Sequence, residues 1–441
     1  MHRLEMQPRM KRRHFISQSA LLALVPVVRP WRFASNTIPR VNGARLVGWI
    51  SAFDNIGRTS GGINRVAYSP GDLAGRAFVL DVMRQSGLTA RTDAAGNIRA
   101  RLDGTDATLR PVMIGSHIDS VTDGGNYDGV VGSFAAIEVA RSLRDQAVRL
   151  RRSLEVVIWQ NEEGGTIGSK LAIGALTNED LDKVARSGRT IREGTSLVGG
   201  DVANLKSAEL RSGDIASYLE LHIEQGGFLE RDGRQIGVVE GIVGLRWLEV
   251  TVTGFANHAG ATPMDRRQDA VLAAAKFTVA VNDAVRGEPG RQVATVGRVV
   301  PSPNTTNVIA GQVVLTVDLR DLDQAKIGRL NDRFVVLAKE IGTATGTTFA
   351  FRTLVDSQPA LCDARIMRFI EESLSALGLS SQRMPSGAGH DAQEIAHVAP
   401  IGMIFVPSVG GISHSPRELT RAADIVNGAD VLLNTVIAAA G

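Results

Sequence analysis

One stretch decides the fold: Pro111-Val112-Met113-Ile114-Gly115-Ser116-His117-Ile118-Asp119-Ser120-Val121, which continues into Gly124-Gly125-Asn126-Tyr127-Asp128-Gly129. The apolar residues 111–114 predict a buried strand that ends at Gly115. A helical pattern begins near Gly129, so a glycine-rich loop separates the strand from the helix. In open α/β sheets, ligands bind at the carboxyl ends of strands. A histidine and aspartates in that place are typical of a site for Zn²⁺ or a similar ion.

Short apolar segments alternate with helical patterns on both sides of this stretch. From Val41 to about Ile242 the pattern predicts helices over 44–53 and 72–85, and strands over 112–114, 154–159, 218–221 and 236–239. It resumes after residue 356 with a helix, a strand at 400–405 and a last helix at 421–439. Such alternation is the mark of an α/β fold.

Residues 243–355 have a different pattern. A strand near 247–254 is followed by a helical stretch over 263–285, strands over 292–300 and 308–319, a helix over 325–341 and a strand over 347–353. This order is that of the split βαβ module. The sequence therefore predicts a metal-binding catalytic domain made of 41–242 and 356–441, interrupted by a second domain over 243–355.

Length and composition agree with a multidomain globular protein. The 441 residues exceed one ordinary core, and hydrophobic and charged contents of 44% and 22% are those of folded chains. Cys362 is the only cysteine, which excludes an intrachain disulfide and a Cys-rich zinc site.

The amino-terminus resembles a twin-arginine export signal. Met10-Lys11-Arg12-Arg13-His14-Phe15-Ile16 precedes an apolar run over 20–28, which is too short to span a membrane. We expect residues 1–35 to direct the protein to the periplasm; the alternative is a cytoplasmic protein with a basic tail. Residues 1–35 carry seven Lys/Arg and one Glu, so the net charge of +3 for the whole chain leaves −3 for the rest. We therefore expect neither a nucleic-acid partner nor a membrane.

Other chemistry-bearing residues also follow predicted strands. Asn161-Glu162-Glu163-Gly164 follows strand 154–159, and Leu221-His222-Ile223-Glu224-Gln225 enters a glycine turn. His414 follows strand 400–405, whereas His397 sits in a plain amphipathic helix and is taken as structural. The candidate metal ligands are His117, Asp128, Glu163, His222 and His414. Three ligands and an open position make a catalytic zinc site, so five suit two ions that share a bridging carboxylate.

These motifs, in this order, resemble those of the N-carbamoyl-L-amino-acid hydrolase, allantoate amidohydrolase and β-ureidopropionase family. The segments 254–264, with His258, and 386–392, with His390, add to the resemblance, which runs from about residue 41 to the end. It implies an aminopeptidase-like catalytic domain interrupted by a lid and dimerisation domain, and hence a homodimer through residues 243–355.

The resemblance also assigns roles. Asp128 would bridge two metals, with His117 and His222 at one and Glu163 and His414 at the other. Asp119 would hold His117 by a hydrogen bond. Glu162 would be the general base. His222 stands where related peptidases carry an acidic residue, which favours the carbamoylase and allantoate branch.

For the substrate, the resemblance makes Arg320 a carboxylate clamp; a salt bridge to Asp318 or Asp321 is the alternative reading. Gln225 and Asn307 would bind polar substrate groups, His258 would polarise the scissile carbonyl from the lid, and His390 would be a further contact. One motif departs from the family, since Glu-Glu-Gly is commonly followed there by Ser-Arg-Phe, and here by Gly165-Thr166-Ile167-Gly168-Ser169.

The sequence thus predicts a binuclear metal amidohydrolase of the α/β class that cleaves a linear ureido or amide bond. The first expected substrate is an N-carbamoyl-L-amino acid, and allantoate is the alternative. A metallopeptidase or an inactive binding protein of the same fold are the further alternatives. Zn²⁺ is the first expected ion, and Mn²⁺, Co²⁺ and Ni²⁺ suit the same donors.

Overall fold

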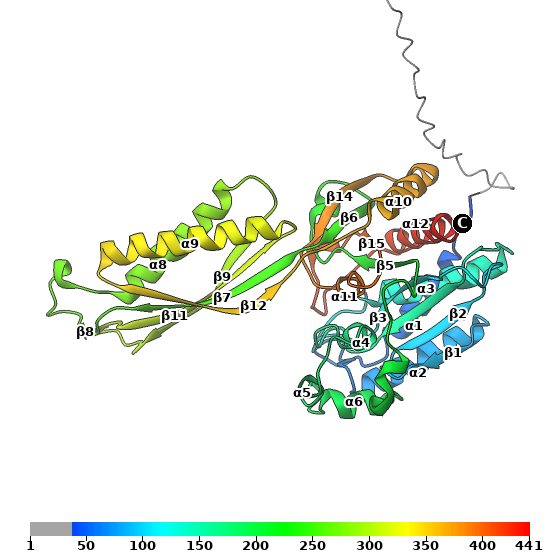
Figure 1. The fold of residues 1–441 in the computed structure, drawn as a ribbon, viewed down its shortest axis with the longest axis horizontal. Coiled ribbons are helices and arrows are strands. Elements are labelled where there is room, and N and C mark those ends of the chain that lie inside the picture. The colour runs from blue at the N-terminus through cyan, green and yellow to red at the C-terminus, as the bar shows by residue number, and fades with distance from the viewer. Residues whose placement is uncertain (1–37) are drawn as a thin grey trace, which may run out of the picture. The chain divides into compact units, whose positions relative to one another are not determined.

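A mixed nine-stranded sheet forms the larger part of the protein. The computed structural model describes residues 38–441, and the export signal predicted for residues 1–35 lies outside them. The strands follow the order β1-β2-β4-β3-β5-β15-β6-β13, and β14 also pairs with β6 (Figure 1). They are β1 Ala90–Thr92, β2 Ile98–Leu102, β3 Val112–His117, β4 Leu154–Trp159, β5 Ser217–Ile223, β6 Ile236–Ile242, β13 Ala360–Leu361, β14 Ser381–Ser386 and β15 Ile401–Val406.

Four parallel neighbours at the centre of this sheet position the candidate site. Strand β3 pairs in parallel with both β4 and β5, and β15 pairs in parallel with β5. These strands are almost wholly buried, as apolar central strands must be. Because parallel strands end at the same edge, the segments that follow them meet there.

The helices of this part pack on the sheet and on one another. Helices α1, α3, α10 and α12 contact each other in series, and α3 and α12 also lie on β3, β5 and β15. Helix α12 is apolar and long enough to cross a membrane, but 61% of its most apolar 18-residue window is buried inside the protein. The helices are α1 Gly43–Phe53, α2 Pro70–Gln85, α3 Val130–Asp145, α4 Ile167–Ala172, α5 Asn178–Leu181, α6 Ile191–Leu197, α7 Phe228–Arg231, α10 Ala364–Leu377, α11 Asp391–Ile395 and α12 Ala422–Ala440.

A second, four-stranded sheet has the order β12-β7-β11-β9, all antiparallel. Its elements are β7 Gly244–Thr253, α8 Ala270–Gly287, β9 Val293–Ser302, β11 Gln312–Asp321, α9 Gln324–Thr345 and β12 Thr348–Ser357. Two short antiparallel strands, β8 Asn257–His258 and β10 Val308–Ile309, form a separate small sheet. Helices α8 and α9 share a core with the sheet. This arrangement is the split βαβ module. The predicted fold class, α/β with an interrupting ferredoxin-like module, is confirmed.

Some expected boundaries are wrong for local reasons. The helix expected over 263–285 begins only at Ala270, because the Asp269 carboxylate accepts hydrogen bonds from the amides of Val271 and Leu272 and caps the helix there. Strands β3 and β5 run on to His117 and Ile223, beyond the expected ends at 114 and 221, so His117 is a strand residue rather than a loop residue and His222 lies inside its strand as predicted.

Candidate metal centre

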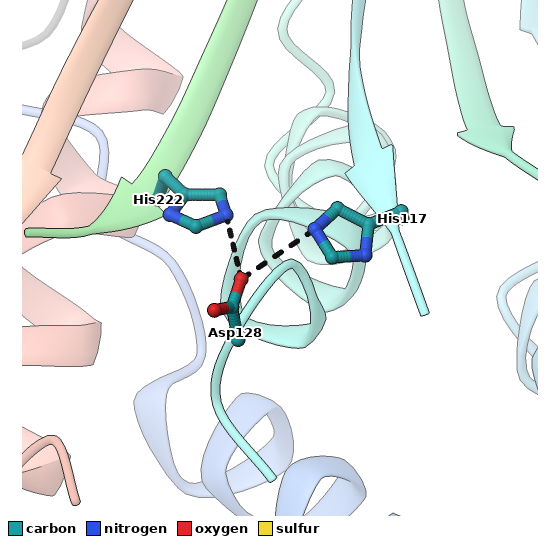
Figure 2. Close-up of side chains that lie close together, drawn as sticks. All are labelled: His117, Asp128 and His222. Carbon is teal, nitrogen blue, oxygen red and sulfur yellow. Dashed lines mark ion pairs between the residues drawn. The ribbon is translucent and has the colours of Figure 1, made fainter. Parts of the chain in front are cut away.

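The Asp128 carboxylate lies at the centre of the site. Its Oδ1 atom is 3.5 Å from His117 Nε2 and 3.1 Å from His222 Nε2. Figure 2 shows both imidazoles, from the ends of β3 and β5, pointing at this one oxygen. All three side chains are buried. Two imidazole nitrogens and a carboxylate oxygen that converge in this way form one candidate ligand set.

The other oxygen of Asp128 faces a second ligand set. Asp128 Oδ2 is 3.3 Å from His414 Nε2, which is itself 3.4 Å from Glu163 Oε1. Oδ2 also accepts hydrogen bonds from Gln225 Nε2 at 2.7 Å and from Ser413 Oγ at 3.0 Å. The side chain of His414 is 49% exposed, so this second set is more open to solvent than the first.

The imidazoles at the first set are oriented by their other nitrogens. His222 Nδ1 donates to the carbonyl of Ile223 at 2.9 Å, and the Gly129 amide donates to His222 Nε2 at 3.2 Å. His117 Nδ1 lies 3.2 Å from the Asp119 carbonyl. A ring held through Nδ1 presents the lone pair of Nε2, which is how ligating histidines are fixed.

Gly129 makes room for this approach. Its φ is +66°, and a Cβ atom there would lie 2.4 Å from the ring of His117. Only glycine therefore fits between the loop that carries Asp128 and the imidazole.

Asp119 holds the two acidic neighbours at the end of β4. Its Oδ1 and Oδ2 accept hydrogen bonds from the amides of Glu162 and Glu163, each at 3.1 Å. Its Oδ1 is also 3.6 Å from His117 Nδ1. Glu162 Oε2 lies 3.6 Å from His117 Nε2, and so faces the first ligand set. The Asp119 carboxylate thus fixes Glu162 and Glu163 relative to each other, whereas the hydrogen-bond contact of Asp119 with His117 is made by its backbone carbonyl.

The carboxylates and imidazoles of the candidate ligand cluster lie so close together that they shift each other's pKa values. Burial and the neighbouring charges raise the pKa of Glu162 well above its usual value and that of Glu163 to about 7. Burial opposes ionisation of Asp128, but hydrogen bonds from His117 and the other imidazoles hold its pKa well below the usual range. The hydrogen bond to Asp128 raises the pKa of His414 to about 9. The carboxylates of Asp128, Glu162 and Glu163 repel each other, and protonated imidazoles offset part of this repulsion. A divalent ion would offset it more strongly, so the cluster favours the binding of divalent ions.

Backbone strain is concentrated around the same cluster. Asn161, Thr166, Gln225 and His414 all have φ between +52° and +57°, in the left-handed region. Non-glycine residues rarely adopt it, and β-branched Thr166 least of all. Such conformations persist where surrounding contacts impose them, and they gather at functional sites.

The donor atoms fit two divalent ions. Two of the three candidate groups contain Asp128: His117, His222 and Asp128, and Asp128, Glu163 and His414; the third is Glu220, His222 and His390, and the donor atoms of each group lie within 4.8 Å of one another. Nitrogen and oxygen donors of this kind suit Zn²⁺, Mn²⁺, Co²⁺ or Ni²⁺.

Of the predicted substrate residues, Gln225 and His390 lie beside these ligands. Gln225 Oε1 is buried and has no hydrogen-bond partner among the described residues. His390 is buried, its ring centroid is 4.4 Å from that of His222, and its Nε2 is 2.8 Å from Ser386 Oγ. Arg320, on β11, forms a bidentate ion pair with Asp318 and donates to the Gly387 carbonyl at 2.7 Å. The salt bridge between Arg320 and Asp318, which the sequence offered as the alternative to a carboxylate clamp, is therefore present.

His258 lies on β8 and Asn307 directly precedes its partner strand β10; both residues are exposed, and none of their hydrogen bonds within residues 38–441 reaches the ligand cluster. His258 Nδ1 accepts from the amides of Gly260 and Ala261, at 3.1 and 3.0 Å. The proton of the neutral ring is therefore on Nε2, and this N–H has no recorded hydrogen-bond partner among residues 38–441.

Sequence reasoning missed two residues of the site. Ser413 and Glu418 bond to Asp128 or to its backbone amide. A glutamate four residues beyond a histidine in a loop gives no periodic or motif signal. The unusual segment after Glu163 closes a turn, in which the amides of Gly165 and Thr166 both donate to the Glu162 carbonyl.

Comparison with known proteins defines the class. Residues 113–438 match the model of peptidase family M20/M25/M40, and the chain belongs to that family. It is 36% identical to an N-carbamoyl-L-amino acid amidohydrolase of Geobacillus stearothermophilus, over 90% of this chain and 98% of that protein. It is also 36% identical to the allantoate amidohydrolase of Escherichia coli, over 87% and 94% of the two chains.

A solved structure agrees with these relatives. A hydantoinase/carbamoylase family amidase from Burkholderia ambifaria superposes with a TM-score of 0.84 at 36% identity, over 92% of this chain and 99% of that one. The predicted resemblance and the predicted enzyme class, a hydrolase of carbon–nitrogen bonds other than peptide bonds, are confirmed.

Replacement of His117 by Ala should lower the bound-metal content of the purified protein, because the first ligand set loses one of its two imidazoles. His397→Ala is the matched control, since His397 is exposed and lies outside both ligand sets. Elemental analysis measures the bound metal in both variants after dialysis against a buffer that contains the metal ion. Equal metal content in His117→Ala and the wild type would contradict the assignment.

Proposed function

We propose that the protein is a binuclear metal-dependent amidohydrolase that hydrolyses N-carbamoyl-L-amino acids to the amino acid, CO₂ and ammonia. The observation that carries this proposal is the position of Asp128, with one oxygen at each of two ligand sets and Glu162 beside the first. The similarity to a carbamoyl-amino-acid amidohydrolase over nearly the whole chain supports the substrate class.

Two divalent ions, with Zn²⁺ as the first candidate, would be held by His117, His222, Asp128, Glu163 and His414. When bound, such ions polarise a carbonyl group and make water more acidic. The first ligand set is buried, which lowers the local dielectric and strengthens the charge interactions within it.

Glu162 is the proposed proton-transfer residue. Its carboxylate faces the ligand cluster and is held from behind by Asp119, which accepts the Glu162 amide. In our proposal Glu162 takes a proton from the attacking water and passes it to the leaving nitrogen. A carboxyl group whose pKa is raised by burial is suited to both halves of this transfer.

Three further residues would bind the substrate. The guanidinium of Arg320 would pair with the substrate carboxylate by exchanging its present partner Asp318. The free Oε1 of Gln225 would accept a hydrogen bond from the ureido nitrogen. Nε2–H of His258 would stabilise the developing oxyanion.

A direct test compares ammonia release from N-carbamoyl-L-amino acids, their carboxamide analogues, allantoate and dipeptides. We expect carbamoyl amino acids with a free carboxylate to be the best substrates. We expect Glu162→Gln to lower kcat by at least about 10²-fold while it keeps its metal content, because only the proton carrier is lost.

The panel also separates the alternatives. Preference for allantoate would place the protein with the allantoate amidohydrolases, and cleavage of dipeptides alone would indicate a metallopeptidase. A metal-loaded wild type that hydrolyses none of these compounds would contradict the enzymatic proposal and favour a binding protein.

We further propose a homodimer through residues 243–355, in which His258 reaches the active site of the other subunit. The edge strand β9 exposes Val293, Val299 and Val300, and an apolar, unpaired sheet edge favours association. The paired strands β8 and β10, next to which His258 and Asn307 lie, belong to this same domain.

Subunit complementation checks this arrangement. Glu162→Gln and His258→Ala should each be nearly inactive, and a refolded 1:1 mixture should recover about a quarter of the wild-type activity, because half the dimers gain one complete site. A mixture that stays inactive, although the subunits have exchanged, would contradict a site shared between subunits.

We also propose that residues 1–35 direct the protein to the periplasm through the twin-arginine route. Export of a folded, metal-loaded enzyme suits this route. Cell fractionation should find a shortened chain in the periplasm, and the Arg12→Lys/Arg13→Lys double variant should stay in the cytoplasm. A cytoplasmic wild-type chain with residues 1–35 intact would contradict the proposal.

A further inference from the structure

Glu418 is a buried carboxylate that the proposed reaction does not use. It is 6% exposed, in the loop between β15 and α12. Its recorded partners among residues 38–441 are two backbone amides and one hydroxyl group, with no guanidinium or ammonium group. Burial of a carboxylate without a cation is costly, so its hydrogen bonds must hold it in place.

Those hydrogen bonds join two parts of the candidate metal centre. Glu418 Oε1 accepts from the amide of Tyr127 at 2.8 Å and from the amide of Asp128 at 3.1 Å. Oε2 lies 2.8 Å from Ser413 Oγ, which is also 3.0 Å from Asp128 Oδ2, so the single proton of this hydroxyl is shared between the two carboxylates. Glu418 therefore connects the backbone of Asp128 to the residue that precedes His414.

The fit around Glu418 is close. A Cβ atom on Gly125, in the loop that leads to Asp128, would lie 2.3 Å from both Cβ and Oε1 of Glu418. The two loops therefore pack directly on each other, and side chains larger than glycine do not fit there.

The two ligand sets depend on this connection to different degrees. His117 and His222 are buried residues of β3 and β5, and the sheet fixes them. His414 is half-exposed, lies in the irregular loop between β15 and α12, and has a φ of +52°. Contacts made by that loop must therefore keep His414 close to Asp128 Oδ2.

We infer that Glu418 is a positioning residue that sets the affinity of the second ion site, made of Asp128, Glu163 and His414, and leaves the first site largely unaffected. This inference rests on the proposed binuclear site. Residues that orient ligands without touching the ion typically change metal affinity by about 10- to 100-fold.

The test is a titration of metal-free protein with Mn²⁺, in which the electron paramagnetic resonance signal of free Mn²⁺ reports each binding step. Glu418→Ala should weaken the second step by at least about tenfold and the first step much less. Glu418→Gln should bind both ions nearly as the wild type does. Its Oε1 still accepts from the two amides, and its Nε2 donates to Ser413 Oγ, which then donates to Asp128.

Glu138→Ala is the matched control. Glu138 is a fully buried carboxylate on α3 that accepts from the Asn42 amide and the Arg45 guanidinium, and it touches no candidate ligand. This variant should lose stability and keep both Mn²⁺ steps. Should Glu418→Ala fail to fold, Ser413→Ala removes only the shared hydroxyl and should weaken the second step in the same direction.

Three results would overturn the inference: an unchanged second step in Glu418→Ala or in Ser413→Ala, equal weakening of both steps, or equal losses in Glu418→Ala and Glu418→Gln. The last would assign the effect to the charge of Glu418 rather than to its hydrogen bonds. A wild type that binds fewer than two Mn²⁺ ions would instead refute the binuclear proposal itself, and with it this inference.

Discussion

The organisation of the site depends on one carboxylate that serves two groups of ligands. Oδ1 of Asp128 faces the imidazoles of His117 and His222, which lie on strands, and Oδ2 faces His414, which lies on a loop. Few arrangements can hold so many acidic and basic side chains in a buried place, since like charges repel and unpaired charges are costly there. The sheet brings these acidic and basic side chains together, because its four parallel strands β4, β3, β5 and β15 end side by side.

Groups that are not themselves candidate ligands hold the candidate ligands in position. Asp119 fixes the two glutamates after β4, the Ile223 carbonyl fixes the ring of His222, and Glu418 joins the Asp128 and His414 loops. The Ile223 contact lies in β5 and the Asp119 contacts join the segments that directly follow β3 and β4, whereas the Glu418 contacts join the β3–α3 and β15–α12 loops. This difference would give the two proposed ion sites different physical characters, although they share a ligand.

Much of this arrangement could be predicted from the sequence. Apolar runs that end in glycine and polar residues placed His117, Glu162, Glu163 and His222 at strand ends, and the change of pattern near Gly244 indicated the second sheet. The remainder depended on contacts between distant segments. The pairing of Ser413 and Glu418 with Asp128 has no sequence signal, because nothing in a loop's periodicity tells which distant loop it will meet. The sequence also could not decide between a free Arg320 and one paired with Asp318, since either is compatible with the same residues.

The central claim, that Asp128 bridges two ions, is tested most directly by anomalous diffraction from crystals of the protein loaded with Zn²⁺, with data collected on both sides of the zinc absorption edge. The account predicts two peaks, one beside His117 and His222 and the other beside Glu163 and His414, with an Asp128 oxygen at each; a typical separation is about 3.5–4 Å. A single peak, or two peaks of which one has no contact with Asp128, would contradict it.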